Sequence, residues 1–520
     1  RFRAIRFQAM LPRFASRIAS ASRRSIQLAR MGPRALPWRA LSSTAPSLRP
    51  YAARDESAAH KFKVIDEEFG SMAFTEEDLA LRVPKSVMER LADCKARHQP
   101  MSPELADVVA QAVLQWSVER GATHFTHWFQ PLTGGTGQKH DTFLKRISSG
   151  RAISALSGKD LVRGEPDASS FPTGGLHTTH EARGYTVWDP SSPLFLVDHG
   201  NGRTLYIPSV FISWFGHALD EKLPLLRSDM ALRTEGLRLL HAMGEKRHTR
   251  VHADCGVEQE FFLVDRKYFL DRPDLRTCGR TLLGTSPPKG QELDDHYFGH
   301  VSERVLQCLE DAERELWRLG VPVSTRHCEV APGQYEIAPV FAPAGPASDM
   351  NMLAMEVLRK IARRHEFAVL FHEKPFAGLN GSGKHNNWSV GTDVVPTLFE
   401  PGQRPLENPL FLTFLAATLR AVDSHADLLR VAISGASNDH RLGANEAPPA
   451  IVSVFLGDVA DVLDAFVEGN QYLMDAAERR YESLERLGLP SFTGHGTNRN
   501  RTSPFAFTGN KFELRAVGSS

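Results

Sequence analysis

The chain has 520 residues, with 62 lysines and arginines against 61 aspartates and glutamates, and is long enough for two or more domains with sizeable cores. A net charge near zero gives no general attraction to nucleic acid or to an acidic partner, and no apolar run approaches the roughly 20 residues of a membrane span. The five cysteines form no CxxC pair, which favours free thiols in a reducing compartment.

The N-terminal segment differs from the rest of the chain. It is rich in Arg, Ser and Ala, and its first acidic residue is Asp55. This is the pattern of a mitochondrial or plastid transit peptide, and an unstructured basic tail is the alternative. We therefore expect residues 1–55 to be an organelle leader or a disordered tail, with the protein in an organelle matrix or otherwise in the cytoplasm.

Residues 56–120 are predicted to form a helical extension. Ser102 is a suitable N-cap, Pro103 and Glu104 suit a first turn, and Gly121 suits a helix end. Residues 121–220 are β-rich, and turn clusters separate segments such as 123–129.

Helices and strands alternate from residue 221 onward. Helical patterns lie near residues 228–244, at 301–319 and around 353–361, and apolar strands lie at 255–264 and 367–371. This alternation predicts an α/β or α+β catalytic domain over residues 221–520.

A turn signal, Pro332-Gly333, separates two short segments that can pair as strands. If those two residues form the loop of a hairpin, Glu329 lies directly opposite Glu336, where like charges repel. A divalent metal ion is the natural cation to hold them together. Two solvated glutamates are the alternative, and Pro-Gly also favours a type II turn, which suits a two-residue hairpin poorly.

Acidic residues also occur in two other closely spaced pairs of charged side chains. Glu258 and Glu260 lie at i and i+2 of an apolar strand, so both point to one face, where carboxylates are rare unless paired or bound to metal. Glu513 and Arg515 repeat the spacing with an acid and a base. One such pair is usually a surface salt bridge, but three in one chain indicate metal binding.

Residues 378–385 nearly match the phosphate-binding pattern GxxxxGK[ST]. However, His385 stands where that loop needs a hydroxyl, and residues 386–391 are a poor helix start. We therefore reject a P-loop. The remaining interpretations are a glycine-rich turn close to a ligand, with His385 as a metal ligand or as a simple turn residue.

Two arginine clusters remain, one at Arg441 and one at Arg499 and Arg501. Guanidinium groups suit carboxylate and phosphate oxygens, and solvated loop charges are the alternative. Together with acids for metal, they describe a nucleotide-dependent phosphoryl-transfer or ligase site.

Seven motifs, taken in their order along the chain, resemble those of glutamine synthetase. Several blocks, notably residues 381–389 and 441–457, are similar in sequence to its type III branch. The seven motifs lie at residues 166–170, 257–262, 327–337, 380–385, 441–449, 500–502 and 511–515. The resemblance covers roughly residues 120–520. It implies an α+β fold with a β-grasp-like domain at 121–220 and a catalytic domain at 221–520, an antiparallel-sheet α/β half-barrel that we expect to be truncated at its C-terminal end.

The resemblance implies a glutamate–ammonia ligase. The reaction would use ATP to join ammonia to L-glutamate through a γ-glutamyl phosphate, with two or more Mg²⁺ or Mn²⁺ ions. One ion would be held by Glu260, Glu329 and Glu336. The second would be held by Glu258, His385 and Glu513.

The resemblance also implies roles for the remaining site residues. Glutamate would be bound by Asn380, Gly381, Arg441 and Arg515. ATP would be bound by Ser389, Arg501 and Lys511. Catalytic roles would fall to Arg501 at the transferring phosphoryl group, to Glu446 as the acid that shields the acyl phosphate from water, and to Asp167 as the acid that binds ammonium.

The family pattern also implies an assembly and shows two departures. A large homo-oligomer of stacked rings is implied, with Asp167 supplied across a subunit boundary and with neither nucleic acid nor membrane as a partner. Ala506 stands where shorter types carry a second arginine, and Arg499 or Lys511 is the candidate to replace it. Because the chain starts at Arg1 and stops at Ser520, soon after the last motif, we expect a fragment truncated at both ends.

Three other functions stay open at this stage. The first is a ligase of the same fold for another amine, such as a γ-glutamylpolyamine synthetase. The second is an inactive, oligomerising homologue with a regulatory role. The third and weakest is a P-loop NTPase.

Overall fold

The computed structural model describes residues 65–97, 99–148, 150–170, 182–285, 296–402, 404–444, 447–468, 488–490 and 503–520. The expected leader lies outside these ranges, as do Glu446, Arg499 and Arg501, so what was predicted for them stays a prediction. Among the described residues, none of the helices is both long and apolar enough to cross a membrane.

The N-terminal part of the described chain begins with four helices. They are α2 (Ile65–Glu68), α3 (Glu76–Ala80), α4 (Lys85–Arg97) and α5 (Pro103–Glu119). As predicted, Ser102 caps α5 by accepting a hydrogen bond from the backbone N–H of Leu105, and Pro103 occupies its first turn. Gly121 follows with a φ of 80°, a left-handed conformation that suits glycine.

A six-stranded mixed sheet follows α5. Its strands are β1 (Ala122–Trp128), β2 (His140–Thr142), β5 (Arg163–Gly164), β6 (Gly184–Trp188), β7 (Phe195–Asp198) and β8 (Arg203–Ser213), in the order β2-β1-β8-β6-β5 with β7 also paired to β8. Strands β1 and β8 are parallel. A separate ribbon, β3 (Leu144–Arg146) with β4 (Ala152–Ser154), and helix α6 (Gly158–Val162) lie between β2 and β5 in the sequence.

Helix α5 packs on this sheet through its apolar face. Val113 and Trp116 are fully buried in one core with Leu205 and Ile207 of β8. A helix across a sheet with a central parallel pair is the β-grasp-like arrangement that the sequence predicted.

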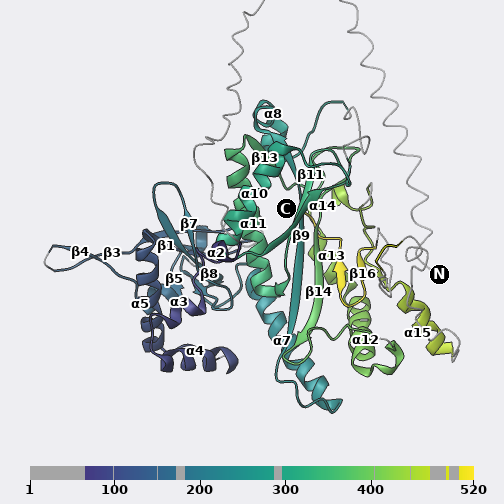
Figure 1. Cartoon of the computed structure of the whole chain (residues 1–520), viewed down its shortest axis with the longest axis horizontal. Coiled ribbons are helices and arrows are strands. Elements are labelled where there is room, and N and C mark those ends of the chain that lie inside the picture. The colour runs from purple at the N-terminus through teal and green to yellow at the C-terminus, as the bar shows by residue number, and fades with distance from the viewer. Residues whose placement is uncertain are drawn as a thin grey trace, which may run out of the picture. The chain divides into compact units, whose positions relative to one another are not determined.

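The second sheet lies in the C-terminal part of the described chain, after residue 250. Its strands are β9 (Val251–Asp265), β10 (Val323–Cys328), β11 (Gln334–Pro339), β12 (Ala342–Pro343), β13 (Phe367–Leu370), β14 (Lys384–Thr392), β15 (Val454–Phe455), β16 (Phe505–Phe507) and β17 (Phe512–Leu514), and its main order is β10-β11-β9-β14-β17-β16-β15. The long strands β9 and β14 run antiparallel side by side through its centre (Figure 1). Every strand pair described in this sheet except β15–β16 is antiparallel, which confirms the predicted α+β half-barrel.

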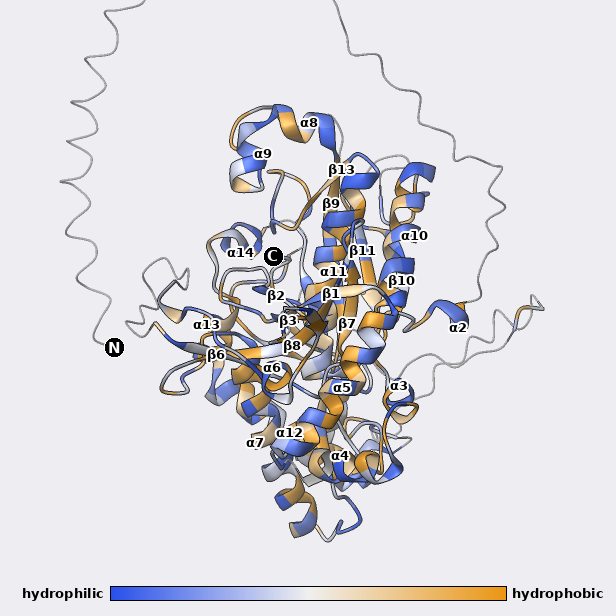
Figure 2. Ribbon diagram, turned by 90° about the vertical axis from the view of Figure 1, so that its left-hand side faces the viewer, coloured by the Kyte–Doolittle hydropathy of each residue, from blue (hydrophilic) through white to orange (hydrophobic). Residues whose placement is uncertain are grey.

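Helices accompany this sheet along the chain. They are α7 (Lys222–Ala242), α8 (Arg266–Asp271), α9 (Pro273–Cys278), α10 (Glu303–Arg318), α11 (Ala344–Arg364), α12 (Pro409–Ser424), α13 (Ala426–Ile433), α14 (Ala436–Arg441) and α15 (Asp458–Glu468). Helix α10 carries both hydrophilic and hydrophobic residues (Figure 2). Leu309 and Leu316 of α10, which corresponds to the helix predicted at residues 301–319, are fully buried.

Helix α7 begins earlier than the sequence pattern indicated. The pattern placed its start near Ser228, but the helix starts at Lys222 and includes Pro224 in its first turn. Proline is tolerated there because first-turn N–H groups have no partner within the helix.

A buried ion cluster around Lys222 of α7 joins residues that follow β1 and β6 of the first sheet to helix α11. Lys222, whose side chain is fully buried, contacts Asp189 at 2.7 Å between Nζ and Oδ2, and it also contacts Asp349 of α11. Gln130 donates to the other oxygen of Asp349 at 2.6 Å. Burial by itself opposes a charge on Lys222, but the two carboxylates outweigh it and raise the pKa of the ammonium group.

We predict that Lys222→Met destabilises the protein by about 3–5 kcal/mol, because it leaves two buried carboxylates without a counter-charge. Urea unfolding followed by fluorescence measures the change. The control is Lys85→Met, whose side chain is 91% exposed and whose loss should change stability by less than about 0.5 kcal/mol. An equal effect of both variants would contradict the assignment.

Candidate metal and substrate site

Carboxylates from strands β9, β11 and β17, with His385 of the intervening β14, share one face of the second sheet. Glu260 of β9 pairs with Glu336 of β11, and Glu258 pairs with His385 of β14. Glu513 of β17 pairs with Asn387, two residues after His385. Because side chains at i and i+2 of a strand point the same way, these pairings gather the acids on one face.

The hairpin between β10 and β11 corrects the predicted register. Glu336 pairs with His327, so Glu329 does not lie directly opposite Glu336. The backbone N–H of Glu329 instead donates to the carbonyl oxygen of Gln334 at 2.8 Å. The offset is two residues, so Glu329 and Glu336 still point to the same face.

The turn explains this correction. The backbone N–H of Gln334 donates to the carbonyl oxygen of Ala331 at 3.1 Å, and Gly333 has a φ of 72°. Pro332 followed by a glycine with positive φ is the type II turn that Pro-Gly favours. Such a turn does not match the twist of paired strands, and the loop accordingly spans residues 330–333 rather than 332–333.

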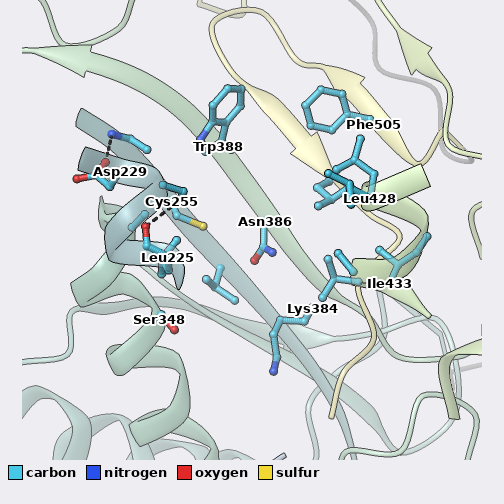
Figure 3. Close-up of a pocket in the computed structure, with 18 of the residues that line it drawn as sticks. Leu225, Asp229, Cys255, Ser348, Lys384, Asn386, Trp388, Leu428, Ile433 and Phe505 are labelled. Atoms are coloured by element: carbon cyan, nitrogen blue, oxygen red, sulfur yellow. Dashed lines mark hydrogen bonds between the residues drawn. The ribbon is translucent and has the colours of Figure 1, made fainter. Parts of the chain in front are cut away.

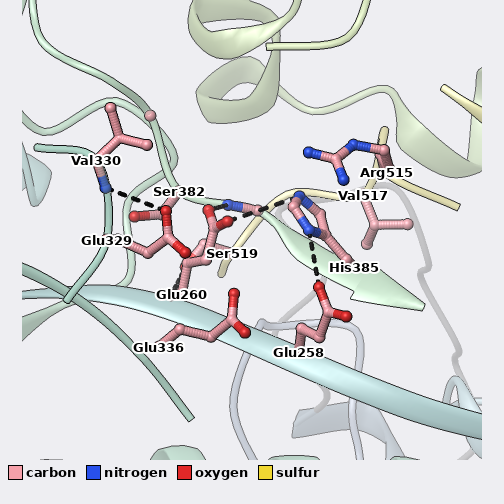
Figure 4. Close-up of polar contacts among 12 residues, drawn as sticks. Glu258, Glu260, Glu329, Val330, Glu336, Ser382, His385, Arg515, Val517 and Ser519 are labelled. Carbon is pink, nitrogen blue, oxygen red and sulfur yellow. Dashed lines mark hydrogen bonds and ion pairs between the residues drawn. The ribbon is translucent and has the colours of Figure 1, made fainter. Parts of the chain in front are cut away.

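Three groups of side chains on this face have ligand atoms within 4.8 Å of one another. The groups are Glu258 with His385 and Glu513, Glu260 with Glu336 and His385, and Glu329 with Glu336 and His327. Figure 4 shows Glu260, Glu329 and Glu336 turned toward a common space, with His385 between Glu258 and Glu260. The structure therefore brings together the six residues predicted to bind metal.

The distances within these groups are short. His385 Nδ1 lies 3.1 Å from Glu258 Oε2 and 3.6 Å from Glu513 Oε1, and its Nε2 lies 3.8 Å from Glu260 Oε1. Glu260, Glu336 and Glu513 are all buried. One imidazole thus touches carboxylates from both predicted metal sets.

Burial makes this concentration of negative charge unfavourable. It raises the pKa of Glu329 to about 7, with a further contribution from Glu336. It also raises the pKa of Glu260 and of Glu336, the latter against a lowering hydrogen bond with His327. For His385, burial lowers the pKa, but Glu260 and the hydrogen bond with Glu258 outweigh that effect and raise it.

A divalent cation suits this donor set. The three groups together hold five carboxylates and two imidazoles, and oxygen-rich sets with an occasional imidazole are what Mg²⁺ and Mn²⁺ accept. Buried carboxylates need a paired charge or a metal, so the residues present fit the predicted cations.

Two residues of this face were not assigned from the sequence. His327 lies 3.3 Å from Glu336 and 3.8 Å from Glu329, and the hydrogen bond with Glu336 raises the pKa of His327 to about 9. Asn387 donates to Glu258 Oε1 at 2.8 Å. A signal for both was present in the sequence, because each lies two residues from a predicted metal ligand: His327 from Glu329, and Asn387 from His385.

A glycine-rich segment, residues 380–383, closes one end of the carboxylate face. The backbone N–H of Gly383 donates to Glu260 Oε2 at 2.6 Å. A Cβ on Gly383 would lie 2.5 Å from Arg441 and 2.7 Å from His385, so only glycine fits there. Strand β14 follows from residue 384, which confirms that this segment is not a P-loop.

Of the two arginines predicted to bind glutamate, Arg441 is buried and Arg515 is partly buried. Arg441, at the end of α14, donates to the carbonyl oxygens of Arg515 at 2.7 Å and of Val517 at 3.2 Å. Arg515 donates to Glu513 Oε1 at 2.6 Å. Both guanidinium groups therefore adjoin the carboxylate face, and they tie the C-terminal residues to it.

Other predicted residues lie apart from the cluster or have other contacts. Ser389 of β14 shares a 2.6 Å hydrogen bond with Thr397, and Lys511 contacts Asn510 at 3.5 Å. Asp167 belongs to the first domain, is exposed, and accepts hydrogen bonds from Ser169. None of these three is among the metal-compatible groups of the described residues.

A cavity of about 1310 Å³ lies against the other face of the same strands. Lys384, Asn386 and Trp388 of β14 point into it, beside Cys255 of β9 (Figure 3). These positions alternate with Glu258, Glu260 and His385, so the cavity and the carboxylate face are separated by the sheet.

Comparisons with known proteins agree with this fold and site. Residues 65–228 match the family model described as glutamine synthetase type III N terminal, and residues 238–448 match that of the glutamine synthetase catalytic domain. The chain belongs to the glutamine synthetase family, and within it to the type III branch.

Curated relatives support the same assignment. The chain is 49% identical over 439 residues to a type-3 glutamine synthetase of Dictyostelium discoideum, covering 84% of this chain and 60% of that protein. It is 48% identical over 458 residues to a glutamine synthetase of Bacteroides fragilis, covering 88% and 62%. The chain therefore spans about three fifths of the length of these relatives.

Solved structures show a similar fold at low identity. A cryoEM structure of Plasmodium falciparum glutamine synthetase has a TM-score of 0.53 at 14% identity, covering 77% of this chain and 69% of that one. A complex of GmaS with ADP has a TM-score of 0.51 at 18% identity, covering 78% and 76%.

We predict that the metal-free protein loses stability as pH rises from about 5 to 7. Glu329 holds a proton up to about pH 7 when folded but only to its ordinary value of 4.5 when unfolded, so the folded state binds more protons in this window. Melting temperatures in EDTA should fall with pH in the wild type and fall less in Glu329→Gln. Glu310→Gln, on the exposed side of α10, should follow the wild type, and three parallel curves would refute the effect.

Proposed function

We propose that the protein is a glutamate–ammonia ligase that forms L-glutamine from L-glutamate, ammonia and ATP through a γ-glutamyl phosphate. The observation that carries this proposal is the face that gathers Glu258, Glu260, Glu329, Glu336 and Glu513 around His385. Family membership supports it, because the matched domains are those of glutamine synthetases.

Two or more divalent ions would complete the site. Glu260, Glu329 and Glu336 would hold one, and Glu258, His385 and Glu513 would hold another. Bound Mg²⁺ or Mn²⁺ supplies positive charge that offsets the phosphate oxygens of ATP. His327 contacts both Glu329 and Glu336 and would help to hold these two carboxylates in place.

The resemblance of the motifs to the family supports the substrate roles. Arg441 and Arg515 would pair with glutamate carboxylates, and the Asn380–Gly381 backbone would orient the amino acid. Ser389 and Lys511 would contact ATP, and Arg501 would stabilise the transferring phosphoryl group. Glu446 would keep water from the acyl phosphate.

Asp167 would bind ammonium and accept its proton. The structure places it in the first domain, outside the carboxylate groups, and exposed. Hydrogen bonds from Ser169 lower its pKa, which keeps it ionised at neutral pH. This position suits a residue supplied to the site of a neighbouring subunit, in a large homo-oligomer.

Replacing Glu329 by alanine should abolish Mg²⁺-dependent formation of γ-glutamyl hydroxamate, by about 100-fold or more, because a metal ligand is lost. The assay uses glutamate, hydroxylamine and ATP, with release of ADP measured in parallel. Glu310→Ala is the matched control and should keep full activity. Retained activity in Glu329→Ala would refute the metal assignment.

A ligase for another amine is the competing function, and Asp167 decides between the two. If ammonium is the substrate, Asp167→Asn should raise the KM for ammonium about tenfold or more and leave that for ATP unchanged. Asp141→Asn, at an exposed aspartate of β2, is the control. Turnover of alkylamines but not of ammonium by the wild type would favour the competitor.

A further inference from the structure

Gln334, the first residue of β11, is a buried amide. It lies between the glycine-rich segment 380–383 and the metal hairpin, by which we mean the β10–β11 hairpin that presents Glu329 and Glu336. It is only 1% exposed. It sits two residues before Glu336 on the same face of its strand, and its backbone oxygen accepts from Glu329. Gln334 is thus part of the hairpin that presents two of the carboxylates.

Its side chain uses all of its hydrogen-bonding capacity. The amide nitrogen donates to the carbonyl oxygen of Gly381 at 3.0 Å and to the hydroxyl of Ser382 at 2.9 Å. The amide oxygen accepts from the backbone N–H of Ala331 at 3.1 Å and from the side chain of Asn380 at 3.2 Å. A primary amide has two donors and two lone pairs, so every position is filled.

These bonds connect two segments far apart in the sequence. One bond closes the hairpin turn, and the other three hold three consecutive residues of the glycine-rich segment. The far side of that segment is held by the backbone, since the N–H of Ser382 donates to the carbonyl oxygen of Glu373 at 2.8 Å. A Cβ on Gly381 would lie 2.6 Å from that same oxygen, so the segment has no room to shift toward Glu373.

We infer that Gln334 is a positioning residue for the glutamate substrate. Its side-chain hydrogen bonds, which we call the clamp, fix the position of Asn380, Gly381 and Ser382 relative to the metal hairpin. Gln334 does so without touching the substrate. The inference rests on the proposed function, because Asn380 and Gly381 are the residues proposed to orient glutamate. It also goes beyond that function, since it makes the hairpin that holds metal the support of the substrate segment.

Gln334→Met tests the clamp, because methionine has a similar length but neither donates nor accepts these bonds. The KM for glutamate should rise about tenfold or more, because a small misplacement of a positioning group has a large kinetic effect. The KM for ATP should stay within about twofold of the wild-type value. The increase in melting temperature caused by Mg²⁺ should stay within about 1–2 °C of that of the wild type, which is roughly the assay error.

Two controls separate positioning from general stability. Gln130→Met removes an equally buried glutamine, 2% exposed, that bonds Asp349 and Ser348; it should lower the melting temperature and leave the KM for glutamate unchanged. Ser382→Ala removes only one of the four partners of Gln334. It should produce a smaller rise in the KM for glutamate, and it serves if Gln334→Met does not fold.

Hydrogen exchange gives a readout that does not depend on turnover. In Gln334→Met the peptide covering residues 378–384 should exchange faster than in the wild type, and in Gln130→Met it should not. If the wild type is active but Gln334→Met changes neither the KM for glutamate nor the hydrogen exchange of residues 378–384, the clamp is overturned and the proposed function stands. A wild type that shows no glutamate-dependent ADP release overturns the proposed function, and exchange then still decides whether the clamp exists.

Discussion

Repulsion among buried carboxylates is the constraint on which this structure depends. Glu260, Glu336 and Glu513 lie almost without solvent in one small region, and burial shifts the pKa values of the first two upward. A protein would not retain such a cluster for stability, because unpaired buried charge is strongly unfavourable. The surrounding elements make sense as the means of holding these acids for a cation.

The sheet achieves this with its two-residue alternation. Acids and His385 occupy one set of positions on β9 and β14, and the side chains at the intervening positions, such as Cys255, Lys384 and Trp388, face the cavity behind. Rigid, doubly flanked strands hold ligands better than loops do, because neighbouring strands limit their movement. Segments without regular structure, such as residues 380–383, are held instead by hydrogen bonds to side chains: the amide of Gln334 donates to Gly381, and the carboxylate of Glu260 accepts from Gly383.

Several parts of this site could be predicted from the sequence. The face shared by Glu258 and Glu260 follows from strand periodicity alone, and the departure of His385 from the P-loop pattern correctly excluded that motif. The hairpin register could not be obtained in the same way. A type II turn at Pro332-Gly333 lengthens the loop, so His327 rather than Glu329 faces Glu336, and the role of His327 was missed.

The sequence by itself determined the family, through the order of separate motifs, and the side of each strand on which the acids lie, because both are properties of local spacing. Only the tertiary structure decided which acids meet, since pairing between β9, β11, β14 and β17 joins residues up to about 140 positions apart, such as Val251 and Thr392. It also decided that Arg441 is buried against the backbone and that Lys222 contacts both Asp189 and Asp349. Contacts of this kind depend on how distant elements pack, and no local pattern encodes them.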